Sequence, residues 1–283
     1  MEHGRPQERD LDDELDGLGR LVVRQSFLGE GDDLIVGGGR GGIDRLDDVK
    51  AVRIFVGGLP ERPEPPLNYQ IVYSIEGVLD YYTTLSWVLR DGKPTQVKAL
   101  SERVPVKFPA PVGELEAFHT AGGLSTMAWR YEGKIPTMEY KTLRYPGHAA
   151  LMEAVREMGL LELEPVDVKG MKVVPRDAFI ATVGPRLTKP HGKDLVALRV
   201  TVEGKKGGKA QTIAFDLIDR YDEKHDISAM MRTTGYSLSI TGQMQVRGEV
   251  KPAGVHTPDE CIPAKRYIEE LAKRGISIHE TVS

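Results

Sequence analysis

Two alternating segments, Leu195–Glu203 and Ala210–Tyr221, constrain the fold of this chain more than any other feature of its sequence. Apolar residues recur at every second position in both, and the glycine- and lysine-rich stretch Gly204–Gly208 separates them. A period of two residues is typical of a strand with one buried face, and glycines favour the backbone conformations of tight turns. The sequence therefore predicts an antiparallel β-hairpin whose apolar positions, such as Leu198 and Phe215, face a core.

Other parts of the chain have the composition of strands and helices. Runs of β-branched and aromatic residues bounded by glycine or proline predict strands at Ala51–Val56, Asn68–Ile75, Thr83–Leu89, Thr95–Leu100 and Thr137–Tyr145. Asp-Gly at the centre of Arg90–Lys93 predicts a hairpin turn. Helical periodicity predicts helices at Ala149–Met158, Tyr236–Val246 and Lys265–Arg274. Hairpin-linked strands with few helices indicate an α+β fold, with a largely antiparallel or mixed sheet and helices on one face.

Two of the predicted helices have a defined apolar side. In the helix at Ala149–Met158 this side follows the i, i+3, i+4, i+7 spacing and consists of Leu151, Ala154, Val155 and Met158. Gly159 follows, and glycine commonly ends a helix because it adopts the left-handed conformation. The later helix carries Tyr236, Ile240 and Met244 on one side. We expect both sides to pack against the core.

Charge is distributed unevenly along the 283 residues. Residues 1–33 contain ten acidic and four basic residues, a net charge of −6, whereas the whole chain carries −4, so residues 34–283 carry +2. The first 33 residues also lack sustained periodicity, and we predict a poorly ordered acidic leader there, followed by one domain over 34–283. A nearly neutral domain gives no electrostatic argument for nucleic acid or a membrane as partner.

Cysteine content and hydropathy limit the class of protein. Cys261 is the only cysteine, so the chain cannot form an internal disulfide or a zinc site built on two of its own cysteines. No apolar run reaches the roughly 18 residues of a membrane span, and the acidic N-terminus lacks the features of a signal peptide. We therefore expect a cytoplasmic protein, and we predict no metal site.

The stretch Gly37–Gly42 satisfies the G-x-G-x-x-G spacing of dinucleotide-binding turns. Its context differs from that of such a turn. The next predicted strand leads into Gly57-Gly-Leu-Pro60 instead of the acidic residue that holds the ribose hydroxyls, and the alternation of strands and helices then stops. We interpret Gly37–Gly42 as a glycine-rich turn or helix start, and we expect no cofactor site in this chain.

Two runs, AFHTAGGLSTM at Ala117–Met127 and YKTLRYPGHAALM at Tyr140–Met152, resemble the C-terminal domain of the saccharopine dehydrogenase and lysine 6-dehydrogenase family. Further blocks occur in the family's order at Val52–Pro60, Pro66–Gly77, Arg232–Tyr236 and Glu269–Gly275. The resemblance covers most of the chain from about Leu34 to Glu280. It implies the substrate-binding and dimerising domain of such an enzyme, and hence a homodimer.

The resemblance also implies a class of reaction. Members of the family oxidise the C–N bond of lysine, saccharopine or a related amino acid with NAD or NADP, or run the reverse reductive amination. In these enzymes a nucleotide-binding domain precedes the region matched here, and residues 1–33 are too few to replace it. We therefore expect NAD(P) chemistry on a small amino-acid substrate, in a shortened chain whose cofactor is bound elsewhere.

Such a reaction needs cations that hold the substrate carboxylates and a group that moves the amine proton. We predict Arg144 as a bidentate carboxylate clamp, and His148, with an unperturbed pKa of roughly 6.5, as the acid/base. Lys141 and Glu116 complete the predicted catalytic set. The further candidates for substrate binding are Glu76, His119, Thr120 and Tyr145.

Each candidate also has a structural interpretation. An arginine in a strand is commonly a surface charge, and a histidine at a helix start is commonly a hydrogen-bonding residue near the cap. Three hypotheses for function therefore stay open. The chain is a substrate domain that relies on a cofactor domain from elsewhere, a non-catalytic amino-acid-binding or oligomerisation module, or a complete small NAD enzyme that uses Gly37–Gly42.

Overall fold

A computed structural model of the chain describes residues 22–23, 39–252 and 254–283. Its main feature is a nine-stranded sheet in the order β13-β11-β10-β2-β7-β3-β4, with β6 pairing to both β7 and β5. The strands of this sheet are β2 Asp48–Pro60, β3 Ser86–Arg90, β4 Lys93–Val97, β5 Val104–Lys107, β6 Glu114–Phe118, β7 Thr137–Arg144, β10 Asp194–Lys206, β11 Lys209–Arg220 and β13 His279–Val282.

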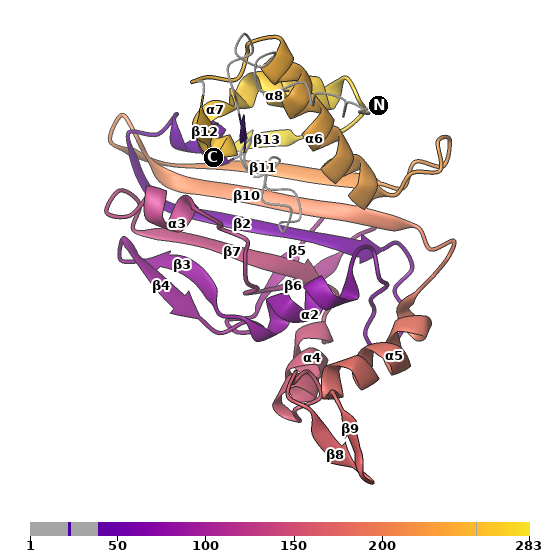
Figure 1. Ribbon diagram of the computed structural model, residues 1–283. Helices are drawn as coiled ribbons and strands as arrows, with labels where there is room; N and C mark the ends of the chain where they lie inside the picture. The colour runs from indigo at the N-terminus through magenta and orange to yellow at the C-terminus, as the bar shows by residue number, and fades with distance from the viewer. Residues whose placement is uncertain (1–21, 24–38, 253) are drawn as a thin grey trace, which may run out of the picture.

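Helices and two small sheets surround the main sheet. The helices are α2 Ile75–Thr83, α3 Met127–Arg130, α4 His148–Glu157, α5 Pro175–Leu187, α6 Ala229–Val246, α7 Pro258–Cys261 and α8 Ala264–Ala272. The small sheets pair β1 Val22–Val23 with β12 Val255–His256, and β8 Val166–Val168 with β9 Met171–Val173. In Figure 1, α6, α7 and α8 gather on one side of the molecule, whereas α4, α5 and the β8–β9 hairpin lie on the opposite side.

The predicted hairpin is confirmed, and it lies in the main sheet between β13 and the central strand β2. β10 and β11 pair antiparallel, with Leu198 opposite Leu217 and Val200 opposite Phe215. Its turn is shorter than predicted, because both strands continue to the two-residue turn of Gly207 and Gly208, whose φ angles are 56° and 76°. Positive φ at both central residues matches the twist of a two-residue hairpin turn and favours glycine.

The sheet is mixed, as predicted for an α+β fold. β2 pairs antiparallel with β10 on one side and parallel with β7 on the other. Parallel neighbours need a crossover connection, and the chain between β2 and β7 contains α2, α3 and four further strands. Because β2 and β7 run in the same direction, their carboxyl ends lie at the same edge of the sheet.

The main core lies between one face of the sheet and helices α6 and α8. Inward residues of β2, β10 and β11 pack with Ile240 and Met244 from α6 and with Leu271 from α8, and Tyr236 is partly buried against the same cluster. The prediction that one side of this helix packs against the core is therefore confirmed. α2, α4 and α5 instead share a separate cluster with Phe118 of β6, so the helices do not all cover one face.

Two local predictions are wrong. Asn68–Ile75 does not form a strand: Ser74 caps helix α2 by accepting a hydrogen bond from the Gly77 amide, and Ile71 donates its amide to the Leu187 carbonyl. Its alternating apolar residues pack around helices instead of joining a ladder.

The apolar side of α4 is the second wrong prediction. The helix itself is confirmed and ends at Gly159 with φ 78°. However, its buried residues are His148, Ala149 and Met152. Of the four residues predicted to face the core, Val155 is partly buried against the cluster of α2, α4 and α5, whereas Ala154 is exposed, Leu151 is 42% exposed and Met158 is 66% exposed.

The described part of the glycine-rich stretch packs on the core. Residues 39–43 are helical, and a Cβ on Gly42 would lie 2.6 Å from Cγ2 of Val202 in β10. Arg40 donates to the carbonyls of Asp259 and Glu260 in α7. Gly37 and Gly38 lie outside the described residues, as does nearly all of the predicted acidic leader over 1–33. Within the described ranges, no helix combines the length and apolarity needed to cross a membrane.

Candidate functional site

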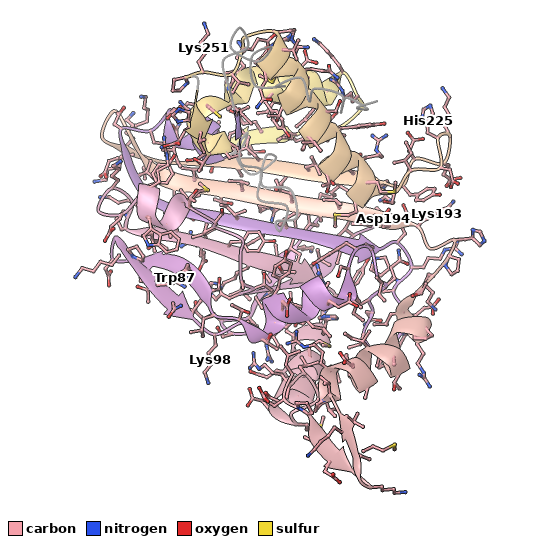
Figure 2. The ribbon with its side chains drawn as sticks, in the orientation of Figure 1. Trp87, Lys98, Lys193, Asp194, His225 and Lys251 are labelled. Carbon is pink, nitrogen blue, oxygen red and sulfur yellow. The ribbon has the colours of Figure 1, made fainter. Side chains whose placement is uncertain are left out.

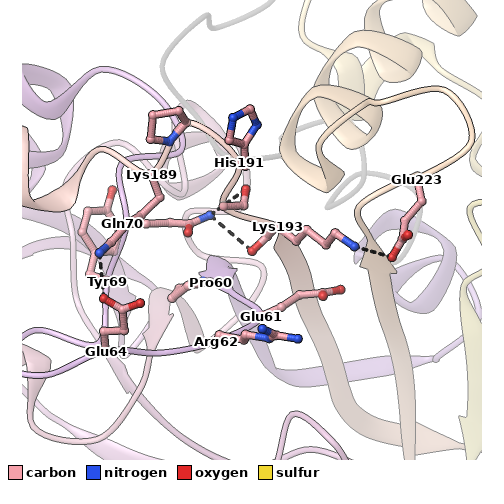
Figure 3. Close-up of a pocket in the computed structure, with 12 residues that line it drawn as sticks. Pro60, Glu61, Arg62, Glu64, Tyr69, Gln70, Lys189, His191, Lys193 and Glu223 are labelled. Carbon is pink, nitrogen blue, oxygen red and sulfur yellow. Dashed lines mark hydrogen bonds and ion pairs between the residues drawn. The ribbon is translucent and has the colours of Figure 1, made fainter.

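One edge of the sheet brings together the strand ends that build a cavity. β2 ends at Pro60, β10 begins opposite it at Asp194, and the parallel strand β7 ends nearby at Arg144. Figure 2 marks this edge with Lys193 and Asp194. The cavity has a volume of about 570 Å³, and Figure 3 shows the residues that line it: Pro60, Glu61, Arg62, Glu64, Tyr69, Gln70, Lys189, Pro190, His191, Gly192, Lys193 and Glu223.

Ion pairs bound the cavity on two sides (Figure 3). Nζ of Lys189 lies 2.7 Å from Oε2 of Glu64, and Nζ of Lys193 lies 2.5 Å from Oε1 of Glu223. All four side chains are substantially exposed, and such surface pairs contribute only about 0–1 kcal/mol to stability. A charged ligand can therefore replace either partner at little cost to the fold.

The buried side-chain amide of Gln70 holds the loop Lys189–Lys193, which carries the two lysines of the cavity wall. Nε2 of Gln70 donates to the carbonyls of Gly192 and Lys193, at 3.4 and 3.3 Å. Glu61 donates its amide to the Lys193 carbonyl, which ties the wall to the end of β2. The contact needs glycine at 192, because a Cβ there would lie 2.4 Å from Oε1 of Gln70 and 2.6 Å from Cβ of Lys189.

Tyr69 separates the cavity from two of the predicted site residues. Tyr69 is one of the residues that line the cavity, while the guanidinium carbon of Arg144 lies 5.2 Å from the centre of its ring and the His148 ring lies 5.4 Å away. A cation over an aromatic face is attracted by the ring's negative face. Arg144 is almost completely buried, and its NH1 donates to the Leu143 carbonyl. Arg144 and His148 thus form a layer behind the cavity wall.

His148 is held by hydrogen bonds to both ring nitrogens. Nδ1 lies 3.0 Å from the Leu67 carbonyl oxygen and Nε2 lies 3.0 Å from the Tyr82 hydroxyl. The ring is stacked with Phe118. Burial, together with the nearby charge of Arg144, lowers the pKa of His148 to about 3. The imidazole is therefore neutral at physiological pH.

Glu116 and Tyr145 belong to the same layer. Glu116 is the cross-strand neighbour of Arg144, and its carboxylate accepts the amide hydrogen of Ala149 at 2.7 Å. A carboxylate that accepts from the first turn of a helix is stabilised by the helix dipole and by the otherwise unsatisfied amides there. The Tyr145 hydroxyl donates to the carbonyl of Pro60 at the cavity edge, and burial raises the pKa of Tyr145.

His119, Thr120 and Lys141 lie in a different cluster on the sheet. Lys141 donates to the Glu102 carbonyl at 2.7 Å, and Thr120 shares a 2.8 Å hydrogen bond with Thr142. Nδ1 of His119 lies 3.1 Å from the Tyr140 carbonyl oxygen and Nε2 lies 3.1 Å from Glu102. Burial lowers the pKa of both His119 and Lys141.

The cluster around His119 has the donor types of a metal site. One oxygen each of Glu102 and Glu139 and a ring nitrogen of His119 lie within 4.8 Å of one another. The carboxylates are already neutralised by cations of the chain, because NH2 of Arg90 lies 2.7 and 3.0 Å from the two acids. A bound cation would have to displace this guanidinium, so the arrangement fits an ion-pair network better than a metal site.

Glu76 belongs neither to the layer with Arg144 and His148 nor to the cluster around His119. It lies in the first turn of α2, is exposed, and accepts a hydrogen bond from the Ser74 hydroxyl at 2.9 Å. Its contacts are those of a residue that caps a helix. None of the eight predicted residues is among those that line the cavity, although Arg144, His148 and Tyr145 each contact a residue that does.

Sequence reasoning missed the charged lining of the cavity. Most of its residues lie in two irregular loops, Glu61–Gln70 and Lys189–Lys193, which carry no periodic pattern, while Pro60 ends β2 and Glu223 follows β11. One signal was available: each loop is rich in charge and proline and follows or precedes a predicted strand. That the two loops meet follows from the antiparallel pairing of β2 with β10, which only the structure shows.

Comparison with known proteins gives the family. Residues 34–276 match the Saccharopine dehydrogenase C-terminal domain. The carboxyaminopropylagmatine dehydrogenase of Synechocystis sp. is 26% identical over 145 residues, which are 49% of this chain and 35% of that protein. The saccharopine dehydrogenase (NADP(+), L-glutamate-forming) of Schizosaccharomyces pombe is 25% identical over 134 residues, which are 47% of this chain and 29% of that protein. The matched segments thus span about a third of these curated relatives.

Two solved structures share the fold. Apo saccharopine dehydrogenase (L-Glu forming) from Saccharomyces cerevisiae superposes with a TM-score of 0.70 at 20% identity, over 89% of this chain and 72% of that one. The homospermidine synthase of Legionella pneumophila in complex with NAD has a TM-score of 0.55 at 11% identity, over 96% of this chain and 59% of that one. Since the family match spans most of its length, this chain belongs to the saccharopine dehydrogenase C-terminal domain family.

Proposed function

We propose that this chain is the substrate-binding domain of an oxidoreductase that acts on the C–N bond of an amino acid with NAD or NADP. The observation that carries the proposal is the cavity of about 570 Å³ whose charged lining contains three acids and three bases. An amino acid carries both signs of charge and is held best where each end meets its opposite. The relatives that are named as dehydrogenases support the reaction class.

The two ion pairs define the roles of the cavity residues. Lys189 and Lys193 would receive the carboxylates of the ligand, while Glu64 and Glu223 would receive its ammonium groups. A ligand that enters replaces two weak exposed pairs with new pairs inside a partly enclosed cavity, where water screens them less. The net gain comes from this change in environment and from the fixed geometry of the wall held by Gln70.

Arg144 and His148 would act from behind Tyr69 and hold its ring in place. The charge of Arg144 and the His148 ring both lie within 5.4 Å of the Tyr69 ring centre. Glu116 and Tyr145 would fix the backbone beside them, through Ala149 and Pro60. We propose that these four residues position the cavity wall, and that His119, Thr120 and Lys141 stabilise the neighbouring strands.

A nicotinamide cofactor would accept or supply the hydride at the reacting carbon. The described part of the glycine-rich stretch does not fit a dinucleotide, because Gly42 packs against Val202 and Arg40 is bound to the carbonyls of α7. We propose that a nucleotide-binding domain outside residues 34–283 holds the cofactor, that the assembly is a cytoplasmic homodimer, and that lysine or saccharopine is the substrate.

A specific observation favours a second candidate, a non-catalytic amino-acid-binding module. His148, the predicted acid/base, is neutral, and both of its nitrogens are hydrogen-bonded to protein groups. An acid/base must reach the substrate proton directly or through a water molecule. A chain with this cavity but no such group would bind amino acids without transforming them.

Calorimetric titration of the full chain with L-lysine, saccharopine and L-glutamate tests the proposed cavity. We expect binding by at least one of these ligands, weakened at least tenfold in Lys193→Gln and Glu64→Gln. Lys98→Gln is the matched control, since Lys98 is exposed and lies far from the cavity edge (Figure 2). Equal affinity in all variants would show that this cavity is not the binding site.

Fusion of a nucleotide-binding domain to the chain separates the two candidate functions. If the chain is the substrate half of an oxidoreductase, the fusion forms NADH or NADPH in the presence of the ligand that binds. Retained ligand binding without turnover under any of the three ligands would identify a binding module instead.

A further inference from the structure

Each acidic residue that lines the cavity already has a cationic partner. The two lysines of the cavity wall neutralise two of the three acids, as described above. The third acid, Glu61, is paired with Arg220 at the end of β11, whose NH1 lies 3.4 Å from Oε1 of Glu61. Arg220 is not among the lining residues, so this third pair uses none of the cations that line the cavity.

Arg62 is the lining cation that is left over. In the part of the chain that the structure describes, no carboxylate oxygen lies within 4.0 Å of its guanidinium nitrogens, and its side chain makes no hydrogen bond. It is exposed and lines the cavity next to Glu61 (Figure 3). Its guanidinium is therefore available to a ligand without the loss of any contact within the described residues.

The charges around the cavity do not cancel. Arg220 and the lining residues together comprise four cations and three acids, a net charge of +1. Because the three ion pairs are each neutral, the excess positive charge is that of Arg62. His191, which also lines the cavity, adds no charge when its imidazole is neutral. A cavity with one unpaired guanidinium favours a ligand that carries one unpaired anion.

The backbone on both sides of Arg62 is held by hydrogen bonds. Before it, Glu61 donates its amide, at 3.0 Å, to the loop that carries the two lysines. After it, the Glu64 carbonyl accepts the amide hydrogen of Asn68 at 2.9 Å, and the ring of Pro63 restricts its own φ angle. A side chain that projects from a held backbone loses less conformational freedom when it binds a ligand.

The two kinds of charge on an amino acid meet this cavity on different terms. A ligand ammonium that binds one of the acids must displace the cation already paired with that acid, so one ion pair replaces another. A ligand carboxylate that binds Arg62 forms a new pair and breaks none. The guanidinium also offers two parallel N–H donors to a carboxylate, which makes this pair stronger than one with a lysine.

We infer that Arg62 sets the charge preference of the cavity and selects acidic amino acids, with one more carboxylate than ammonium groups, over basic ones. The amino acid head group would occupy the exchangeable ion pairs, and the additional carboxylate would bind Arg62. This role of Arg62 rests on the proposed function, because it takes the cavity as the ligand site. Of the two substrates proposed above, it favours the one with more carboxylates.

A phosphate group is the other anion that a guanidinium commonly binds. Such a group carries a charge of about −1.5 to −2 at pH 7. Three carboxylates line the same cavity, and they repel a dianion more strongly than a single carboxylate. Inorganic phosphate should therefore bind more weakly than an acidic amino acid.

Calorimetric titration of the full chain with three ligands of one carbon skeleton tests the inference. L-2-aminoadipate, L-norleucine and L-lysine end in a carboxylate, a methyl and an ammonium group, so their net charges are −1, 0 and +1. We expect aminoadipate to bind at least tenfold more tightly than norleucine, and lysine to bind no more tightly than norleucine. A pH of 8, at the upper end of the range in which histidine titrates, keeps His191 from adding charge.

Variants of Arg62 assign the preference to this side chain. Arg62→Gln should bind aminoadipate at least tenfold more weakly than the wild type does, with norleucine within twofold of its wild-type affinity. Arg62→Lys keeps the charge but loses the parallel donors, so part of the preference should remain. Lys251→Gln is the matched control: it removes one exposed positive charge far from the cavity edge (Figure 2) and should leave all three affinities unchanged.

Thermal unfolding should show wild-type midpoints for both variants, because Arg62 is exposed. Four results would overturn the inference: lysine bound as tightly as aminoadipate, a preference retained in Arg62→Gln, inorganic phosphate bound more tightly than aminoadipate, or saccharopine bound without any binding of aminoadipate. Each of these leaves the cavity as the ligand site. A chain that binds no amino acid at all would instead refute the proposed function, so the two failures are distinguishable.

Discussion

The hydroxyl oxygen of Tyr82 lies 3.0 Å from Nε2 of His148, and a hydroxyl can either donate a hydrogen bond to this nitrogen or accept one from it. On the other side of the ring, Nδ1 faces the Leu67 carbonyl oxygen, which can only accept a hydrogen bond. Nδ1 therefore carries the proton, and Nε2 accepts from Tyr82. A second proton on the ring would oppose the Tyr82 hydrogen bond inside a fully buried site next to Arg144.

This arrangement predicts a pH-dependent loss of stability. The pKa of His148 is about 3 when folded, against roughly 6.5 when unfolded, so between these values only the unfolded chain binds the extra proton. Stability should fall as the pH falls from about 6.5 toward 3, by about 2 kcal/mol between pH 7 and pH 5. Urea denaturation at both pH values measures this change.

The variant His148→Gln isolates the effect of this residue. Glutamine can donate to the Leu67 carbonyl and accept from Tyr82 but does not titrate. The difference in unfolding free energy between wild type and variant should shrink by about 2 kcal/mol from pH 7 to pH 5. The same pH dependence in both proteins would contradict the assigned pKa.

Gly192→Ala should damage the cavity more than the fold. A Cβ at 192 would lie 2.6 Å from Cβ of Lys189, an atom that moves only with its backbone, so the loop that carries Lys189 and Lys193 must shift. We expect at least tenfold weaker binding of the amino acid ligand by calorimetry, with little change in the urea midpoint. Gly184→Ala, in the neighbouring helix α5 and with open space around it, should bind the ligand normally.

Gly57→Ala should destabilise the centre of the sheet. A Cβ at this position in β2 would lie 2.2 Å from the carbonyl oxygen of Leu143 in β7, and backbone cannot move aside as a flexible side chain can. We expect a loss of at least about 3 kcal/mol in the free energy of unfolding, or failure to fold. Gly235→Ala on α6, where nothing lies within 4 Å of the added Cβ, should be neutral or slightly stabilising.

The buried pair of Arg232 and Asp219 should show strong energetic coupling. Nε of Arg232 lies 2.9 Å from Oδ2 of Asp219, and its NH1 lies 2.9 Å from Asp222. Arg232→Met should cost about 3 kcal/mol, because Asp219 would be left buried without its counter-ion. In a double-mutant cycle with Asp219→Asn, the double variant should lose at least about 1 kcal/mol less than the sum of the single losses. Additive losses would mean that the pair is not coupled.

The fold could be predicted where side-chain periodicity is strong. The β10–β11 hairpin and the helices α4, α6 and α8 follow from the spacing of apolar residues, which local geometry imposes directly. Asn68–Ile75 was predicted wrongly because a composition rich in β-branched and aromatic residues does not distinguish a strand from an irregular segment that packs between helices. At the end of this segment Ser74 caps helix α2, so the last residues of the predicted strand belong to a helix start.

Less of the candidate site than of the fold could be predicted from the sequence. The family resemblance predicted Arg144 and His148 as site residues. Both contact Tyr69, a lining residue of the cavity that comes from a distant part of the chain. The lining residues Glu64 and Lys189 are 125 residues apart and meet only because β2 and β10 pair. No local pattern encodes such a contact, so it could not be predicted from spacing or composition.

The position of β2 at the centre of the sheet has a consequence for how the chain folds. Arg53 of β2 pairs with Glu203 of β10 across 150 residues of sequence, so β2 must wait for most of the chain before both of its neighbours are present. Closing such long loops costs entropy before any contact compensates it, and high contact order slows folding. During synthesis, β2 would emerge with two unpaired edges, and this stage is when the chain is most exposed to aggregation.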